Sequence, residues 1–138
     1  MSHENLKVVI GSWQAYADAG LDAMAEFWDA DINWRAIEGA PDDVGEMRGV
    51  DAVRRYAQDW LDTFDELTTV PEEVLDLGDD RVLAVLRVTG RARLSGVPTE
   101  LRYAVLCTVR GGRIVRVREY ADREQALAAA RAAGENPS

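Results

Sequence analysis

Glu119 is the residue whose type and position most directly suggest chemistry. Gly111-Gly112 reads as a turn, and the stretch Ile114 to Tyr120 that follows it reads as a strand. Because strand side chains alternate, Val115, Val117 and Glu119 are expected on one face, as two apolar residues and one carboxylate. Burial among apolar walls raises the pKa of a carboxyl toward the range useful for general acid or base catalysis. The alternative is a structural role, in which Glu119 pairs with an arginine at the rim of the sheet.

Six aromatic residues are candidate ligand contacts. They fall on predicted inward faces of helices and strands, where flat side chains with polar tips can form the walls of a pocket. The six are Trp13, Tyr16, Trp34, Tyr56, Trp60 and Tyr103. Packing in the hydrophobic core is the alternative for each of them.

Several other chemistries lack support in the sequence. The single histidine, His3, stands near the N-terminus, and no carboxylate spacing matches a calcium loop, so no metal is expected. Because the only histidine lies in this N-terminal tail, no Ser-His or Cys-His catalytic unit is expected. No glycine-rich phosphate loop is visible, and no cofactor is expected. Cys107 lies inside the apolar run YAVLCTV and is expected to be a small core residue rather than a nucleophile.

Length and charge restrict the expected partners. The chain has 138 residues, which fits one domain, and a net charge of −9, which disfavours nucleic acid and anionic membranes. No apolar run approaches the roughly 20 residues that span a bilayer, and the first residues show no leader pattern, so a cytoplasmic protein is expected. Nine arginines but one acid, Glu100, lie between positions 81 and 118. We expect this arginine-rich sheet face to pair with acidic helices or with a second subunit.

Periodicity and turn signals predict the elements that must position these residues. Apolar residues at helical spacing predict helices over 4–17, from Leu21 through Trp28, and from about 50 through Phe64. Extended stretches predict strands over 32–37, 67–77, 82–94, 98–110 and 114–120, and Asp122 is a good N-cap for a last helix over 123–133. Residues 38–49 read as a loop. The result is an α+β domain in which helices cover one face of a curved antiparallel sheet.

This order of elements resembles the nuclear transport factor 2-like superfamily, and within it SnoaL-like proteins. The segments that carry the resemblance are WQAYADAGLDAMAEFWDADINW, RGVDAVRRY and GGRIVRVREY. Relatives of SnoaL-like proteins include polyketide cyclases, ketosteroid isomerase and limonene epoxide hydrolase. The resemblance implies one domain over residues 1–138, with a core over about 6–127 and a cone-shaped sheet wrapped around N-terminal helices. It also implies a mostly apolar internal pocket and a homodimer formed through the outer face of the sheet.

The resemblance assigns roles to individual residues. Glu119 stands where SnoaL-like cyclases have an acid on the last strand, but Val117 replaces the histidine that often precedes it. Trp13 falls where ketosteroid isomerase has a hydrogen-bonding tyrosine, and an indole can donate but has no acid–base chemistry. Ala36 stands at the position of the isomerase's catalytic aspartate. Glu38, two residues further on, is the candidate substitute.

Two further arrangements of charged residues are possible. An epoxide hydrolase of the limonene type has an Asp-Arg-Asp arrangement, for which the candidates are Glu119, Glu100 and either Arg87 or Arg102. Arg35, in a predicted covered strand, needs a carboxylate partner, which Glu38 or Asp31 would supply.

The sequence therefore predicts a SnoaL-like protein that binds a small hydrophobic molecule in an internal pocket. If the protein is an enzyme, it is expected to catalyse proton transfer of the cyclase or isomerase type through Glu119. The main alternative is a non-catalytic ligand-binding or dimerisation module, because Val117 and Ala36 lack acid–base groups. Epoxide hydrolysis is a minor alternative.

Overall fold

The computed structural model describes residues 2–41 and 43–135. Their elements, in chain order, are α1 (Ser2–Ala19), α2 (Leu21–Ala25), β1 (Trp28–Arg35), β2 (Met47–Arg48), α3 (Val50–Leu61), β3 (Phe64–Gly78), β4 (Arg81–Ala92), β5 (Pro98–Arg110), β6 (Arg113–Tyr120) and α4 (Arg123–Glu135). The predicted order of helices and strands is confirmed, with one addition. The two-residue strand β2 lies inside the segment predicted to be a loop.

The strands form one sheet in the order β2-β1-β6-β5-β4-β3. The predicted meander from β3 to β6 is antiparallel throughout, and β1 pairs antiparallel with β2. The pairing of β1 with β6 is parallel, a departure from the predicted all-antiparallel sheet. These two strands are far apart in the chain, and the long connection through α3 and the meander permits the parallel direction.

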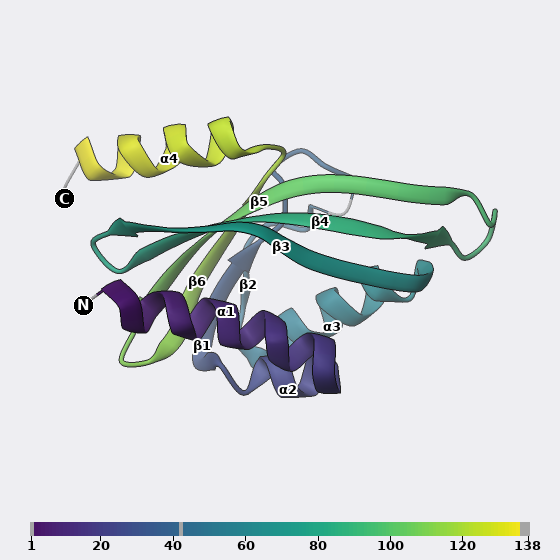
Figure 1. The fold of residues 1–138 in the computed structure, drawn as a ribbon, viewed down its shortest axis with the longest axis horizontal. Helices are drawn as coiled ribbons and strands as arrows, with labels where there is room; N and C mark the ends of the chain where they lie inside the picture. Colours follow the sequence, from purple (N-terminus) through teal and green to yellow (C-terminus); the bar gives the residue numbers. More distant parts are fainter. Residues whose placement is uncertain (1, 42, 136–138) are drawn as a thin grey trace.

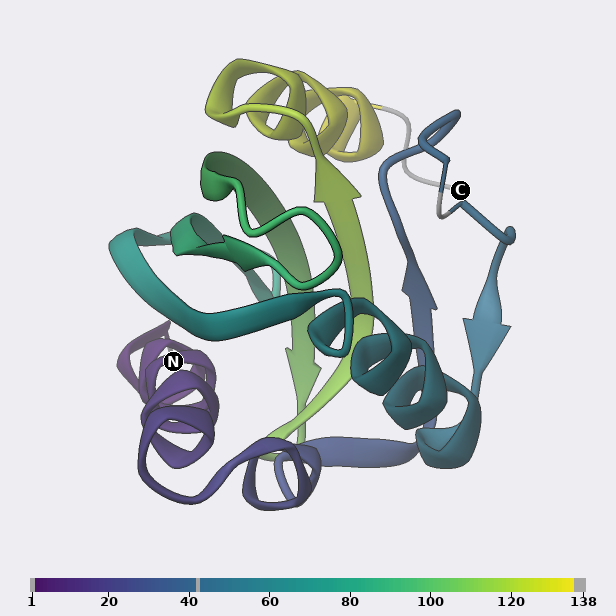
Figure 2. The same cartoon turned by 90° about the vertical axis from the view of Figure 1, so that its right-hand side faces the viewer.

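The predicted α+β arrangement of a curved sheet around N-terminal helices is confirmed (Figures 1 and 2). The main core packs on the concave face of the sheet under α1, α2 and α3, with Ile32 and Leu86 fully buried in it. The prediction that helices cover one face only is wrong, because α4 lies on the opposite face. There Ala126 packs in a second cluster with Leu83 and Ala104. No helix within the described residues is long and apolar enough to cross a membrane.

The position of α4 concerns the expected dimer. A homodimer through the outer face of the sheet stays a prediction. Within that face, α4 already covers part of the surface formed by β4, β5 and β6.

Two aromatic residues that were predicted to end helices belong to strands instead. α2 ends at Ala25, and Trp28 is the first residue of β1, where it pairs with Ile114. α3 ends at Leu61, and Phe64 is the first residue of β3. In both places pairing across the sheet outweighs the helical period of the sequence, which is a weak signal at the end of a short helix.

A β-bulge in β6 changes which of its residues face the core. The register with β5 shifts so that Val115 is an extra residue on β6. Ile114 and Val117 are therefore the β6 members of the buried core, where Val115 and Val117 were predicted. Glu119, two residues after Val117, keeps the predicted inward direction and lines the cavity described below.

Acidic residues of other strands of the same sheet pair with the arginines of β4 and β5 and of the turn between them. The ion pairs are Arg87–Glu100, Arg91–Glu66, Arg93–Asp65 and Arg102–Glu72. The acids belong to β3 and β5, so the expected pairing with acidic helices is wrong for these four arginines.

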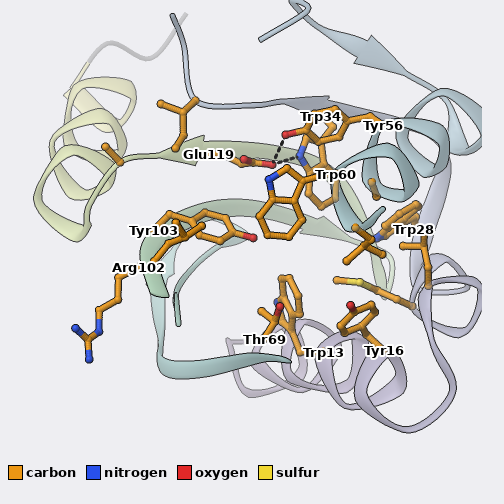
Figure 3. Close-up of a pocket in the computed structure, with 17 residues that line it drawn as sticks. Trp13, Tyr16, Trp28, Trp34, Tyr56, Trp60, Thr69, Arg102, Tyr103 and Glu119 are labelled. Carbon is orange, nitrogen blue, oxygen red and sulfur yellow. Dashed lines mark hydrogen bonds between the residues drawn. The ribbon is translucent and has the colours of Figure 1, made fainter. Parts of the chain in front are cut away.

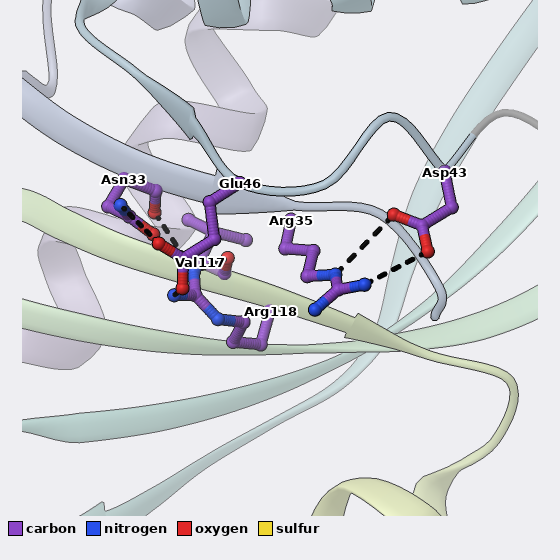
Figure 4. Close-up of polar contacts among 6 residues, drawn as sticks. All are labelled: Asn33, Arg35, Asp43, Glu46, Val117 and Arg118. Carbon is purple, nitrogen blue, oxygen red and sulfur yellow. Dashed lines mark hydrogen bonds and ion pairs between the residues drawn. The ribbon is translucent and has the colours of Figure 1, made fainter. Parts of the chain in front are cut away.

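The loop between β1 and β2 is fastened to the sheet by an ion pair that the sequence did not predict. Arg35 pairs with Asp43 at 3.1 Å, rather than with Glu38 or Asp31 (Figure 4). Two backbone N–H groups of the loop also donate hydrogen bonds to the Asp43 carboxylate, at 2.9 and 3.0 Å. The hydrogen bond from Arg35, assisted by these two, lowers the pKa of Asp43 to about 2.

A second arginine joins the same loop to β6. Arg118 forms an ion pair with Glu46, just before β2, at 3.1 Å (Figure 4). The side-chain amide of Asn33 in β1 also donates a hydrogen bond to the Glu46 carboxylate. Burial lowers the pKa of the Arg118 guanidinium, the largest cause of its shift. These contacts hold the end of β6 against β1, directly beside Glu119.

Candidate functional site

A cavity of about 370 Å³ lies between the concave face of the sheet and helices α1, α2 and α3 (Figure 3). Seven of its 17 lining residues are aromatic, and they include all four tryptophans of the chain. Most of the other lining residues are aliphatic: Leu21, Met24, Ile37, Ala57, Leu61, Leu101 and Ala121. The volume is near the lower end of the range typical of small-molecule sites, and the apolar wall suits a flat, largely apolar molecule.

All six aromatic residues singled out from the sequence line this cavity. Helical spacing brings Trp13 and Tyr16 together on α1, with ring centroids 6.2 Å apart. Tyr56 and Trp60 lie one turn apart on α3, and the Trp60 ring also contacts Tyr103 of β5, with centroids 6.5 Å apart. A role in ligand binding stays a prediction for each.

Glu119 is the one carboxylate among the lining residues. The indole Nε1–H of Trp34 donates a hydrogen bond to Glu119 Oε2 at 2.7 Å, which is in the short range of charge-assisted bonds. The Tyr56 hydroxyl donates to the same oxygen at 3.4 Å, near the limit of a hydrogen bond. β1 and β6 pair directly, with Trp34 opposite Val117, so the sheet itself sets the distance between donor and carboxylate. The structure thus fixes Glu119 by groups on two other elements.

Trp28 also lines the cavity, although it is not among the six aromatic residues singled out from the sequence. Placing it at the end of a helix hid its position at the start of β1, where it packs edge-to-face against Trp34 with centroids 5.6 Å apart. The parallel pairing of β1 with β6 brings Trp28 to the cavity. No local sequence signal predicts a pairing over such a distance along the chain.

The other predicted acid does not reach the cavity. β1 ends at Arg35, so Glu38 lies in the following turn and is exposed, away from the cavity lining. Ala36 and Val117, at the positions where the resemblance places an aspartate and a histidine, are buried aliphatic residues that are each 2% exposed.

The epoxide hydrolase arrangement is also not assembled. Arg87 and Arg102 pair across β4 and β5, with Arg87 joined to Glu100 and Arg102 to Glu72. Strand alternation places them on the outer face, because the adjacent Leu86–Tyr103 pair faces inward. Figure 3 shows the Arg102 side chain pointing away from the cavity.

Burial also changes two other ionisable groups. It raises the pKa of Tyr16, whose hydroxyl therefore stays a neutral hydrogen-bonding group. It raises the pKa of the Cys107 thiol to about 12, and this residue is 3% exposed, which confirms its predicted place in the core. Among residues 2–41 and 43–135, no cluster of three or more His, Cys, Asp or Glu side chains could hold a metal ion.

Comparison with known proteins agrees with this fold. Residues 9–117 match the SnoaL-like domain family. An uncharacterised protein of Mycobacterium tuberculosis is 35% identical over 120 residues, which cover 86% of this chain and 89% of that protein.

Solved structures add to the comparison. An NTF2-like protein of Burkholderia thailandensis superposes with a TM-score of 0.76 at 27% identity, over 93% of this chain and 95% of that one. A second Mycobacterium tuberculosis protein was crystallised in complex with estradiol-17beta-hemisuccinate. It superposes with a TM-score of 0.72 at 18% identity, over 88% of this chain and 95% of that one. The match of residues 9–117 shows that this chain belongs to the SnoaL-like family, with a nuclear transport factor 2-like fold.

Proposed function

We propose that the protein binds a flat, neutral, carbonyl-bearing molecule in the aromatic cavity, and that Glu119 transfers a proton to or from it. The observation that carries the proposal is the single carboxylate of the lining, held at 2.7 Å by the indole of Trp34. A carboxylate fixed within an apolar wall is positioned to act on a ligand that fills the cavity.

The lining supports the class of ligand. Aromatic rings from α1, α3, β1 and β5 surround the space, so a planar molecule can stack against several of them at once. The net charge of −9 and the Glu119 carboxylate both disfavour an anionic ligand. A protein of the same fold binds a steroid ester, which supports the capacity of this fold to hold a ring system.

The proposed step balances without a co-reactant. The Glu119 carboxylate takes a proton from a carbon next to the ligand's carbonyl group, and the electron pair of the C–H bond forms the C=C bond of an enolate. The negative charge moves to the carbonyl oxygen. Return of the proton from Glu119, to the same carbon or to another carbon of the enolate, completes exchange or isomerisation.

The exchange of a carbon-bound proton tests this step. 2-Tetralone, a two-ring ketone, carries acidic C1–H bonds between its carbonyl and its aromatic ring, and NMR in D2O follows their replacement by deuterium. We expect the protein to accelerate this exchange and Glu119→Gln to lower the protein-dependent rate by about 10²-fold or more. The glutamine keeps an oxygen that accepts the Trp34 hydrogen bond. Glu38→Gln, a matched change outside the cavity, should leave the rate unchanged; equal rates for wild type and Glu119→Gln would reject the proposal.

A binding protein without chemistry is the second candidate. It is favoured by Ala36 and Val117, which are buried and cannot replace the acid–base residues that the family resemblance places there. This candidate predicts saturable binding of 2-tetralone with no protein-dependent exchange at C1.

A further inference from the structure

Trp28 carries an N–H group without an acceptor in the part of the chain that the structure describes. The residue is 3% exposed, and its Nε1 is itself buried and has no hydrogen-bond partner there. Buried N–H groups are nearly always paired, and an unpaired one costs free energy because it has lost water and gained nothing. Such an orphan at a ligand cavity is a candidate ligand contact.

The orphan N–H lies in the wall of the cavity. Trp28 is one of the lining residues, and Figure 3 shows its indole nitrogen on the side that faces the other labelled side chains. Its ring meets Trp34 edge-to-face, with centroids 5.6 Å apart, whereas the Trp34 N–H is engaged by Glu119. Two neighbouring indoles thus differ in role, since one fixes the carboxylate and the other has a donor to offer. Met24, which lines the same cavity, is unbranched, so it can adjust when a ligand approaches.

We infer that Trp28 Nε1–H donates a hydrogen bond to the carbonyl oxygen of the bound ligand. This inference rests on the proposed function, and it narrows the ligand class to neutral ketones. Hydrocarbons of the same shape should bind with lower affinity than these ketones. A ligand that supplies the missing acceptor removes the cost of the orphan donor, so the carbonyl gains affinity beyond its contact area. If the ligand's carbonyl oxygen accepts this hydrogen bond, the same N–H also stabilises the negative charge that develops on that oxygen when Glu119 removes a proton.

A matched pair of probes isolates the carbonyl. 2-Tetralone and tetralin have the same two-ring skeleton and differ in the carbonyl group, and their dissociation constants can be measured by NMR titration. Trp28→Phe removes the N–H and keeps an aromatic ring. We expect it to weaken 2-tetralone binding about tenfold and tetralin binding less than twofold. Leu101→Ala, the control, changes an aliphatic residue of the same cavity that has no side-chain donor, so it should affect both probes equally.

The outcomes separate this inference from the proposed function. Equal effects of Trp28→Phe on both probes, or no effect on either, would overturn the donor role while Glu119-dependent exchange could still hold. If neither probe binds the wild type, both proposals fall.

A second measurement covers the case in which Trp28→Phe does not fold. In the wild-type protein, 2-tetralone should move one of the indole N–H signals in a ¹⁵N-edited NMR spectrum downfield, whereas tetralin should not. A ketone that binds without moving any indole N–H signal would overturn the inference.

Discussion

The hydrogen bond between Trp34 and Glu119 should make a measurable contribution to the free energy of unfolding. Its length is 2.7 Å, the pair is partly buried, and the acceptor is a carboxylate. Hydrogen bonds to charged groups contribute about 1.5–3 kcal/mol. Trp34→Phe removes the donor, and Glu119→Leu removes the acceptor with a side chain of similar size. Because the loss of indole packing occurs in both backgrounds, it cancels in a double-mutant cycle.

Urea unfolding of the wild type, both single variants and the double variant at pH 7 gives the coupling free energy. We expect about 1.5–3 kcal/mol. A coupling below about 0.5 kcal/mol, which is the usual error of additivity, would refute the view that Trp34 fixes the carboxylate. A parallel cycle of Tyr56→Phe with Glu119→Leu should give less than about 1 kcal/mol, because the hydroxyl is 3.4 Å from Oε2.

Three other predictions test the surrounding fold. The pKa of Asp43 is lowered to about 2 from an unfolded value near 3.9, so its stabilising effect is present above about pH 4 and lost as pH falls through 2. The free energies of urea unfolding of the wild type and Asp43→Asn should therefore differ at pH 7 and converge toward pH 2. Cys107, buried and with its pKa raised to about 12, should resist iodoacetamide at pH 8 until the protein is unfolded in urea; labelling of the native protein would contradict its core position. Gly90→Ala should lower the free energy of unfolding by about 1–3 kcal/mol, because the added Cβ would lie 3.2 Å from Leu67 Cα and 3.3 Å from the Asp65 carbonyl oxygen. An unchanged urea midpoint would show that the β3 backbone shifts to make room for the added Cβ.

The features that could be predicted from the sequence are those set by local pattern. Alternation and turns place the meander strands, with β5 at its predicted bounds, and helical spacing places Trp13 with Tyr16 and Tyr56 with Trp60 on shared faces. The inward direction of Glu119 also follows from alternation, since it lies two residues from the buried Val117.

The features that could not be predicted depend on contacts between distant segments. The parallel pairing of β1 with β6 turns Trp28 from a helix residue into a strand residue and brings it to the cavity. The bulge at Val115 places Ile114 in the core instead of Val115, and no glycine at that position marks the bulge in the sequence. Asp43 pairs with Arg35 because the loop folds back on the strand, a route that no spacing in the sequence specifies.

A fluorescence titration tests most directly whether the aromatic cavity binds a ligand. All four tryptophans line the cavity, so their emission reports on its contents. We expect 2-tetralone to change the emission saturably in the wild type and in Ala132→Phe, a matched change on the exposed surface of α4. Ala57→Phe, which adds a ring to the cavity wall, should weaken binding about tenfold or more. Unchanged binding in Ala57→Phe, or no saturable change in the wild type, would contradict the account.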